Sequence, residues 1–230
     1  MASFRRLMCR VAPRAAAPIL ACGSSVALAD EAKLRQKKSW WWGPPPKENA
    51  THLKDLEAVV VTEKRTGVEF LDHLDGLKLA GCGVRAKFGV VPVYAVGFYA
   101  SPAYRSDDID PISALGDVPA ALRITLVRHL DASTFVKAIE DQLATRVSDA
   151  AQLKAFVDAC VASLPAAMVP GTTTTLGLEP SGQVTVTSDA SKTTALFAPQ
   201  VAAALLDVYL GPNAVSPAAR DAILKGLANF

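Results

Sequence analysis

The sequence predicts an α+β fold in which helices cover one face of an antiparallel sheet. Three observations lead to this class. Segments with the two-residue periodicity of strands dominate residues 56–130, segments with helical periodicity follow to about residue 164, and a late hairpin precedes two final helices. A parallel α/β sheet requires strands and helices to alternate along the chain, and they do not.

Strands account for the first half of the predicted domain. A short hairpin is expected because the apolar runs 56–62 and 66–71 are divided by Glu63-Lys64-Arg65. Two long strands, 77–88 and 90–100, turn around Gly89. The second of them is apolar on both faces, so we expect it to be covered on both sides. A further strand is predicted over 121–130.

The second half begins with two helices, one from Asp131 or Ser133 to about Arg146 and one over 149–164. Cys160 lies on the apolar face of the second helix, which predicts a packed core thiol and not a nucleophile. The remaining predicted elements are strands 172–178 and 183–188 around a Pro-Ser-Gly turn, a nearly apolar helix over 198–210, and a last helix capped by Ser216 and opened by Pro217.

Charge divides the chain into a basic tail and an acidic body. Residues 1–54 contain ten Lys/Arg and three Asp/Glu, net +7, which leaves 14 of the 24 basic and 19 of the 22 acidic residues, net −5, for residues 55–230. Residues 1–29 are acid-free and carry four arginines beside an apolar helical stripe, which is typical of an organelle transit peptide. We expect a mitochondrial address, with a plastid as the alternative; a secretory signal and a weak membrane anchor are further options.

A linker over residues 30–52 joins the tail to a domain over 53–230. It contains three adjacent tryptophans, then a run of prolines that enforces an extended backbone. The bases and tryptophans of residues 33–42 suit peripheral contact with a membrane surface, or packing back on the domain as a collar. Nucleic-acid binding has little support, because the body is acidic and no basic stripe continues past residue 54.

Most motifs of catalytic chemistry are missing from the sequence. There is no CxxC, HExxH or phosphate-binding Walker loop, and the three histidines have no ligand spacing. Two of the four cysteines lie in the presumed transit peptide, which argues against a disulfide framework or a zinc site. We therefore assign no catalytic and no metal-binding residue and expect no cofactor.

Arg85 stands out because it lies in the middle of a predicted strand. Gly81 and Gly83 precede it on the same face and leave room for something to lie against the backbone. A guanidinium suits a carboxylate bidentately, and Tyr94 on the next strand can add a hydroxyl to the same anion. The plainer interpretation, favoured by spacing alone, is an arginine paired with a neighbouring acid.

These residues belong to a recognisable pattern. Residues 81–85 (Gly-Cys-Gly-Val-Arg) and 93–99 (Val-Tyr-Ala-Val-Gly-Phe-Tyr) resemble the signature of the chalcone isomerase family and its fatty-acid-binding and mitochondrial chalcone-isomerase-like relatives; residues 170–171, 209–211 and 215–217 add further matches. The resemblance covers about residues 56–227. It implies an open-faced β-sandwich, with a large antiparallel sheet covered by helices and a ligand cleft between them.

The resemblance also implies site residues. Arg85 occupies the place of the arginine that helps true isomerases bind their phenolate substrate. Tyr94 takes the place of a threonine before the Ala-x-Gly of the next strand, and Phe135 takes the place of the active-site tyrosine.

Three more positions depart from the isomerases. Gln142 replaces an asparagine, Leu126 a lysine and Val208 a threonine. The exchanges at Phe135 and Val208 remove hydrogen bonds that ring closure of a chalcone requires and make the cleft more apolar. Such a cleft, with one arginine and one tyrosine, suits a chain carboxylate.

The first functional hypothesis is therefore a non-enzymatic binding protein for a fatty acid or similar amphipathic carboxylate in an organelle. Its predicted ligand-binding residues are Arg85, Tyr94, Phe135, Gln142 and Val208. The alternatives are an isomerase-type intramolecular lyase acting on a flavonoid-like phenol, which the replaced positions argue against, and a haem-binding mitochondrial member, for which His129 or another histidine would be the ligand. The sequence leaves enzymatic activity open and leans against it.

Overall fold

A seven-stranded antiparallel sheet is the centre of the structure, a computed structural model that describes residues 59–87, 89–105, 110–189 and 192–230. These residues belong to one unit that spans Glu57–Phe230. The transit peptide, the linker and the membrane contact predicted for residues 33–42 lie outside the described residues. The strands of the sheet, in spatial order, are β11 (Thr193–Phe197), β10 (Gln183–Ser188), β9 (Thr173–Leu178), β6 (Ala120–Leu126), β5 (Val91–Ala100), β4 (Leu77–Lys87) and β3 (His73–Leu74).

Two short antiparallel pairs accompany the sheet. One joins β1 (Val60–Thr62) to β2 (Glu69–Leu71), which confirms the predicted early hairpin. The other joins β7 (Leu130–Asp131) to β8 (Ala167–Met168) and ties the chain before the first long helix to the chain after the second.

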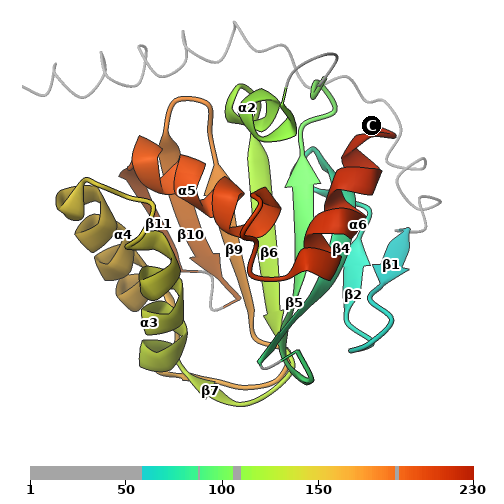
Figure 1. Cartoon of the computed structure of the whole chain (residues 1–230). Helices are drawn as coiled ribbons and strands as arrows, with labels where there is room; N and C mark the ends of the chain where they lie inside the picture. The colour runs from blue at the N-terminus through green and yellow to red at the C-terminus, as the bar shows by residue number, and fades with distance from the viewer. Residues whose placement is uncertain (1–58, 88, 106–109, 190–191) are drawn as a thin grey trace, which may run out of the picture. The chain divides into compact units, whose positions relative to one another are not determined.

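The longer helices gather on one face of the sheet, as predicted (Figure 1). They are α3 (Ala132–Leu143), α4 (Ala150–Ser163), α5 (Pro199–Leu210) and α6 (Pro217–Leu227); the short α2 (Pro111–Gly116) packs against α5. In this arrangement α4 packs on β10 and β11, and α6 packs on β4. Cys160 of α4 is 1% exposed, and burial raises the pKa of its thiol to about 12, so the predicted core thiol is confirmed.

The central strand β5 is covered on both faces, which confirms the prediction from its composition. Val96 and Phe98 belong to the main core beneath the helices. On the opposite face, Ala95 and Tyr99 pack with Phe70 of β2 in a smaller cluster. The early hairpin therefore closes part of the face that the helices leave open.

Some boundaries differ from those predicted. Strand β6 ends at Leu126 and not at residue 130, because residues 127–129 leave the sheet towards β7. Strand β11 and helix α2 were not predicted. Strand β11 is an edge strand of five residues that alternates exposed and half-buried positions, so it lacks the apolar run that signals a buried strand.

Side-chain caps hold the beginnings of α4 and α6. Asp149 accepts hydrogen bonds from the amides of Ala151 and Gln152 at the start of α4, as expected of a cap. At the start of α6, Ser216 Oγ accepts from the amide of Ala219 and donates to the carbonyl oxygen of Val84 at 2.7 Å. The first turn of α6 is thus fastened to β4 directly beside Arg85.

Helix α6 occupies the room that Gly81 and Gly83 leave. A Cβ atom added at Gly83 would lie 2.6 Å from Cα of Ala219, and one added at Gly81 would lie 2.8 Å from the carbonyl oxygen of Ala222. The glycines therefore serve close helix-to-strand packing. Arg85, two residues further on, is left beyond the beginning of the helix.

Replacing Gly83 by alanine is expected to lower the free energy of unfolding by about 1–3 kcal/mol, because the new methyl group overlaps the backbone of α6. Urea denaturation of the two proteins measures the difference. Gly116→Ala is the matched control, since a Cβ atom there meets nothing within 4 Å. Equal stability of Gly83→Ala and the parent protein would contradict the packing described.

Candidate functional site

A cavity of about 510 Å³ lies between the sheet and helices α3 and α5. This volume is within the range of small-molecule sites, which are mostly apolar with a few polar groups. Its lining comprises Arg85 and Lys87 of β4, Val93 and Tyr94 of β5, Arg128, His129 and Leu130 after β6, Thr134, Phe135, Ala138, Ile139 and Gln142 of α3, Leu205, Val208 and Tyr209 of α5, and Val215 before α6.

The structure brings all five predicted site residues to this one cavity. Arg85, Tyr94, Phe135, Gln142 and Val208 come from two strands and two helices and are up to 123 positions apart, yet each lines the same space. Their part in ligand binding stays a prediction. Leu126, at the position of the isomerases' lysine, is 1% exposed and belongs to the core beside the cavity.

Arg85 enters the cavity with most of its hydrogen-bonding capacity unused. Its Nη1 donates to the carbonyl oxygen of Val215 at 3.3 Å, and no other bond of its side chain occurs among the described residues. A guanidinium has five N–H donors. No carboxylate of the described chain forms an ion pair with Arg85, so the plainer interpretation of a structural salt bridge is wrong for this part of the protein.

Tyr94 and Tyr209 form a buried pair of hydroxyl groups at the cavity wall. Their oxygens are 3.0 Å apart, and the residues are 8% and 3% exposed. Tyr94 is also the direct cross-strand neighbour of Arg85 and makes an edge-to-face contact with the ring of Phe135. One of the two hydroxyl protons lies in the bond between the tyrosines, and the other is left to donate to a ligand.

Burial keeps both tyrosines neutral. Desolvation raises the pKa of Tyr94, while the hydrogen bond from Tyr209 and the charge of Arg85 partly offset it. The pKa of Tyr209 is raised well above its usual value, chiefly by desolvation. At physiological pH the pair is therefore a hydrogen-bond donor to an anion, and Arg85 supplies the positive charge.

An ion pair fixes the two helices that wall the cavity. Arg146, just after α3, binds Asp207 of α5 with its Nε 2.6 Å from Oδ2. Its other nitrogens donate to the carbonyl oxygens of Gln142 and Asn213 at 2.7 and 3.2 Å. Arg146 therefore links α3, α5 and the loop before α6 on one side of the cavity.

Comparison with known proteins identifies the fold. A family model described as chalcone isomerase-like matches residues 65–225. The chain belongs to the chalcone isomerase-like family. The resemblance drawn from residues 81–85 and 93–99 is thereby confirmed.

A solved structure supports the same fold for this chalcone isomerase-like protein. The crystal structure of a fatty-acid binding protein from Arabidopsis thaliana is similar with a TM-score of 0.62, over 74% of this chain and 98% of that one, at 19% sequence identity. At this identity the likeness concerns the fold. Among curated proteins, none matches the sequence.

Tyr209 is the site residue that sequence reasoning missed. It lies on α5, which was predicted to be buried nearly all round, and its partner Tyr94 is 115 positions away. The signal available was a hydroxyl group on an otherwise apolar helix, since a buried tyrosine usually finds a partner for its O–H. Lys87 and Arg128 were also missed, and His129, named only as a possible haem ligand, lines the cavity with them.

Neither a metal centre nor a membrane span is visible in the described parts of this family member. Residues 59–87, 89–105, 110–189 and 192–230 contain no cluster of three or more His, Cys, Asp or Glu side chains that could hold a metal ion. Within the same residues, no helix is both long and apolar enough to cross a membrane. His129 is the one described histidine that lines the cavity.

Proposed function

We propose that this chalcone isomerase-like protein binds a fatty acid or a similar amphipathic carboxylate without changing it chemically. The single observation that carries the proposal is a mostly apolar cavity that contains one guanidinium with unused donors beside a buried pair of neutral tyrosines. The carboxylate would lie on Arg85 and take the outward proton of the tyrosine pair. The alkyl chain would lie against Phe135 and Val208.

The composition of the lining supports binding more than catalysis. Phe135 and Val208 face the cavity without the hydroxyl groups that the isomerases carry at these positions. Ring closure of a chalcone requires polar groups that activate a phenolate and hold the ketone. A fatty acid requires one anion-binding point and an apolar surface, and this cavity offers both.

Titration of the purified protein with hexadecanoate, followed by native mass spectrometry, tests the proposal. We expect one fatty acid to bind per chain and to compete with a second carboxylate of similar length. Turnover of a chalcone without fatty-acid binding would favour the lyase alternative, and a Soret absorbance band in the purified protein would favour haem.

Location is a separate part of the proposal. The composition of residues 1–29 supports import into a mitochondrion, with a plastid as the alternative, and residues 33–42 suit peripheral contact with a membrane surface. A fluorescent fusion of the full chain should enter mitochondria, and the same fusion without residues 1–29 should stay outside them. Equal distribution of the two fusions would overturn the assignment of residues 1–29.

Replacing either tyrosine by phenylalanine is expected to weaken hexadecanoate binding by roughly 2- to 10-fold, because each variant removes the hydrogen bond between the two neutral hydroxyl groups, worth about 0.5–1.5 kcal/mol, which orients the donor to the carboxylate. The double variant should lose less than the product of the two single effects, since one outward proton serves both hydroxyl groups. Calorimetric titration of the parent protein, the two single variants and the double variant gives the coupling free energy between the two hydroxyl groups. Strictly multiplicative losses would show that the tyrosines act independently.

A further inference from the structure

Part of the cavity lining is basic. Lys87, Arg128 and His129 line it together with Arg85, and no Asp or Glu belongs to the lining. Lys87, Arg128 and His129 are exposed, whereas Arg85 is half-buried. The acid nearest in sequence to Arg128 and His129 is Asp131, at the N-cap position of α3; its side chain makes no capping hydrogen bond and does not line the cavity.

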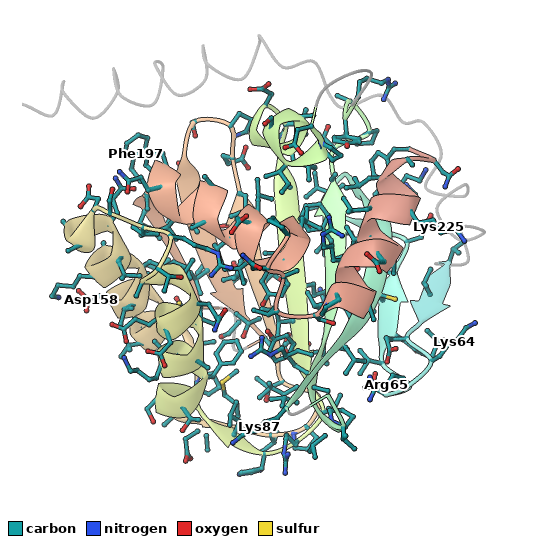
Figure 2. The ribbon with its side chains drawn as sticks, in the orientation of Figure 1. Lys64, Arg65, Lys87, Asp158, Phe197 and Lys225 are labelled. Atoms are coloured by element: carbon teal, nitrogen blue, oxygen red, sulfur yellow. The ribbon has the colours of Figure 1, made fainter. Side chains whose placement is uncertain are left out.

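The register of the sheet places Lys87 and Arg128 further along the sheet than Arg85. Tyr94 is the direct neighbour of Arg85 on one side and of Leu126 on the other. Lys87 lies two residues after Arg85 at the end of β4, about 7 Å further along the strand, and Arg128 lies two residues after Leu126, just beyond the end of β6. Figure 2 shows Lys87 at this lower end, where β4 stops before the turn into β5.

No group of the described residues pairs with the side chain of Arg128 or His129. Neither side chain makes an ion pair or a side-chain hydrogen bond with the described residues. Arg146 and Arg220, in contrast, both bind a carboxylate and a backbone carbonyl oxygen of the fold. A monocarboxylate on Arg85 would satisfy one cation and leave Arg128 without a counter-charge from the described residues.

We propose that the outer cations form a second anion subsite and that the ligand is a long-chain amphiphile whose head contains a phosphate group. A phosphate monoester carries a charge of about −1.5 to −2 and three strong acceptor oxygens. The planar guanidinium of Arg128 suits two of these oxygens, and His129 and Lys87 can donate to the third. The proposal rests on the proposed function, because it places the alkyl chain in the same cavity and Arg85 at the inner side of the head.

Competition between two amphiphiles with the same chain tests the subsite. We expect dodecyl phosphate to bind the full-length protein at least about 10-fold more tightly than dodecanoate at neutral pH. The double variant Arg128→Gln/His129→Gln should reduce this preference to within about 2-fold and leave dodecanoate affinity within about 3-fold of the parent value. Lys154→Gln, which removes an exposed cation of α4 that is not part of the cavity lining, should retain the preference.

Further outcomes separate this inference from the proposed function. If dodecanoate binds through Arg85 and dodecyl phosphate binds no more tightly, the phosphate subsite is wrong and the proposed function stands. If neither amphiphile binds, both fail. The double variant could keep its preference for dodecyl phosphate and lose only its sedimentation with vesicles that contain anionic lipid. In that case the outer residues contact a membrane surface and the subsite is overturned.

Two more ligands distinguish the possible sources of the phosphate group, a lipid head group and a coenzyme A thioester. Tighter binding of dodecanoyl glycerol phosphate than of dodecanoyl coenzyme A would identify a lipid head group, and the reverse order would identify a coenzyme A thioester. Either order supports a phosphate subsite provided that the double variant abolishes the gain over dodecanoate. Weaker binding of both than of dodecanoate would contradict it.

Discussion

Replacing Arg85 by alanine is expected to weaken hexadecanoate binding by roughly 10- to 100-fold. The guanidinium is the innermost cation of the cavity and has donors to spare, and hydrogen bonds to a charged group are worth about 1.5–3 kcal/mol. The loss should appear mainly for ligands with a free carboxylate. Calorimetric titration with hexadecanoate and with its methyl ester separates the charged head from the alkyl chain.

Two control variants make the Arg85 result interpretable. Arg85→Lys keeps the charge but loses the planar fork, so we expect a loss intermediate between the parent protein and Arg85→Ala. Lys154→Ala removes an exposed cation of α4 and should bind as the parent protein does. Unchanged hexadecanoate affinity in Arg85→Ala, with the fold intact by circular dichroism, would contradict the proposed carboxylate site.

Replacing Ala138 by tryptophan is expected to abolish long-chain binding, with a loss of at least about 100-fold for hexadecanoate. Ala138 lies on α3 between Phe135 and Gln142 and faces the cavity, so the indole would occupy the space proposed for the alkyl chain. Each CH₂ excluded from the cavity costs about 0.8 kcal/mol of transfer free energy. Octanoate should therefore lose less affinity than hexadecanoate in the same titration.

The variant should fold, because Ala138 is exposed in the cavity and not packed in the core. Its free energy of unfolding should stay within about 1 kcal/mol of the parent value. Ala155→Trp, at an exposed position of α4 that does not line the cavity, is the matched control and should bind normally. If Ala138→Trp bound octanoate and hexadecanoate as tightly as the parent protein does, the alkyl chain would have to lie elsewhere.

Much of the fold follows from local patterns. The two-residue periodicity of residues 77–100 and the cap Ser216 predict elements that the structure contains. Local patterns could not show which element occupies the space over Gly81 and Gly83. The occupant is α6, more than 130 residues later, and a glycine records only that something comes close.

Some residues of the candidate site were also predictable from local patterns, and others were not. Arg85 and Tyr94 were recognisable because a cation and a hydroxyl interrupt apolar strands. Along α3, four residues at helical spacing line the cavity, and a periodicity analysis cannot tell them from core: Phe135, Ala138, Ile139 and Gln142. Tyr209 and Arg128 join the site only through tertiary contacts, so no spacing in the sequence indicates them.

The most direct measurement is a crystal structure of the protein with hexadecanoate bound. The account predicts a carboxylate within hydrogen-bonding distance of the Arg85 guanidinium and of one hydroxyl of the Tyr94–Tyr209 pair. The alkyl chain should run between α3 and α5 past Phe135 and Val208. A fatty acid bound outside this cavity, or a carboxylate that turns away from Arg85, would contradict it.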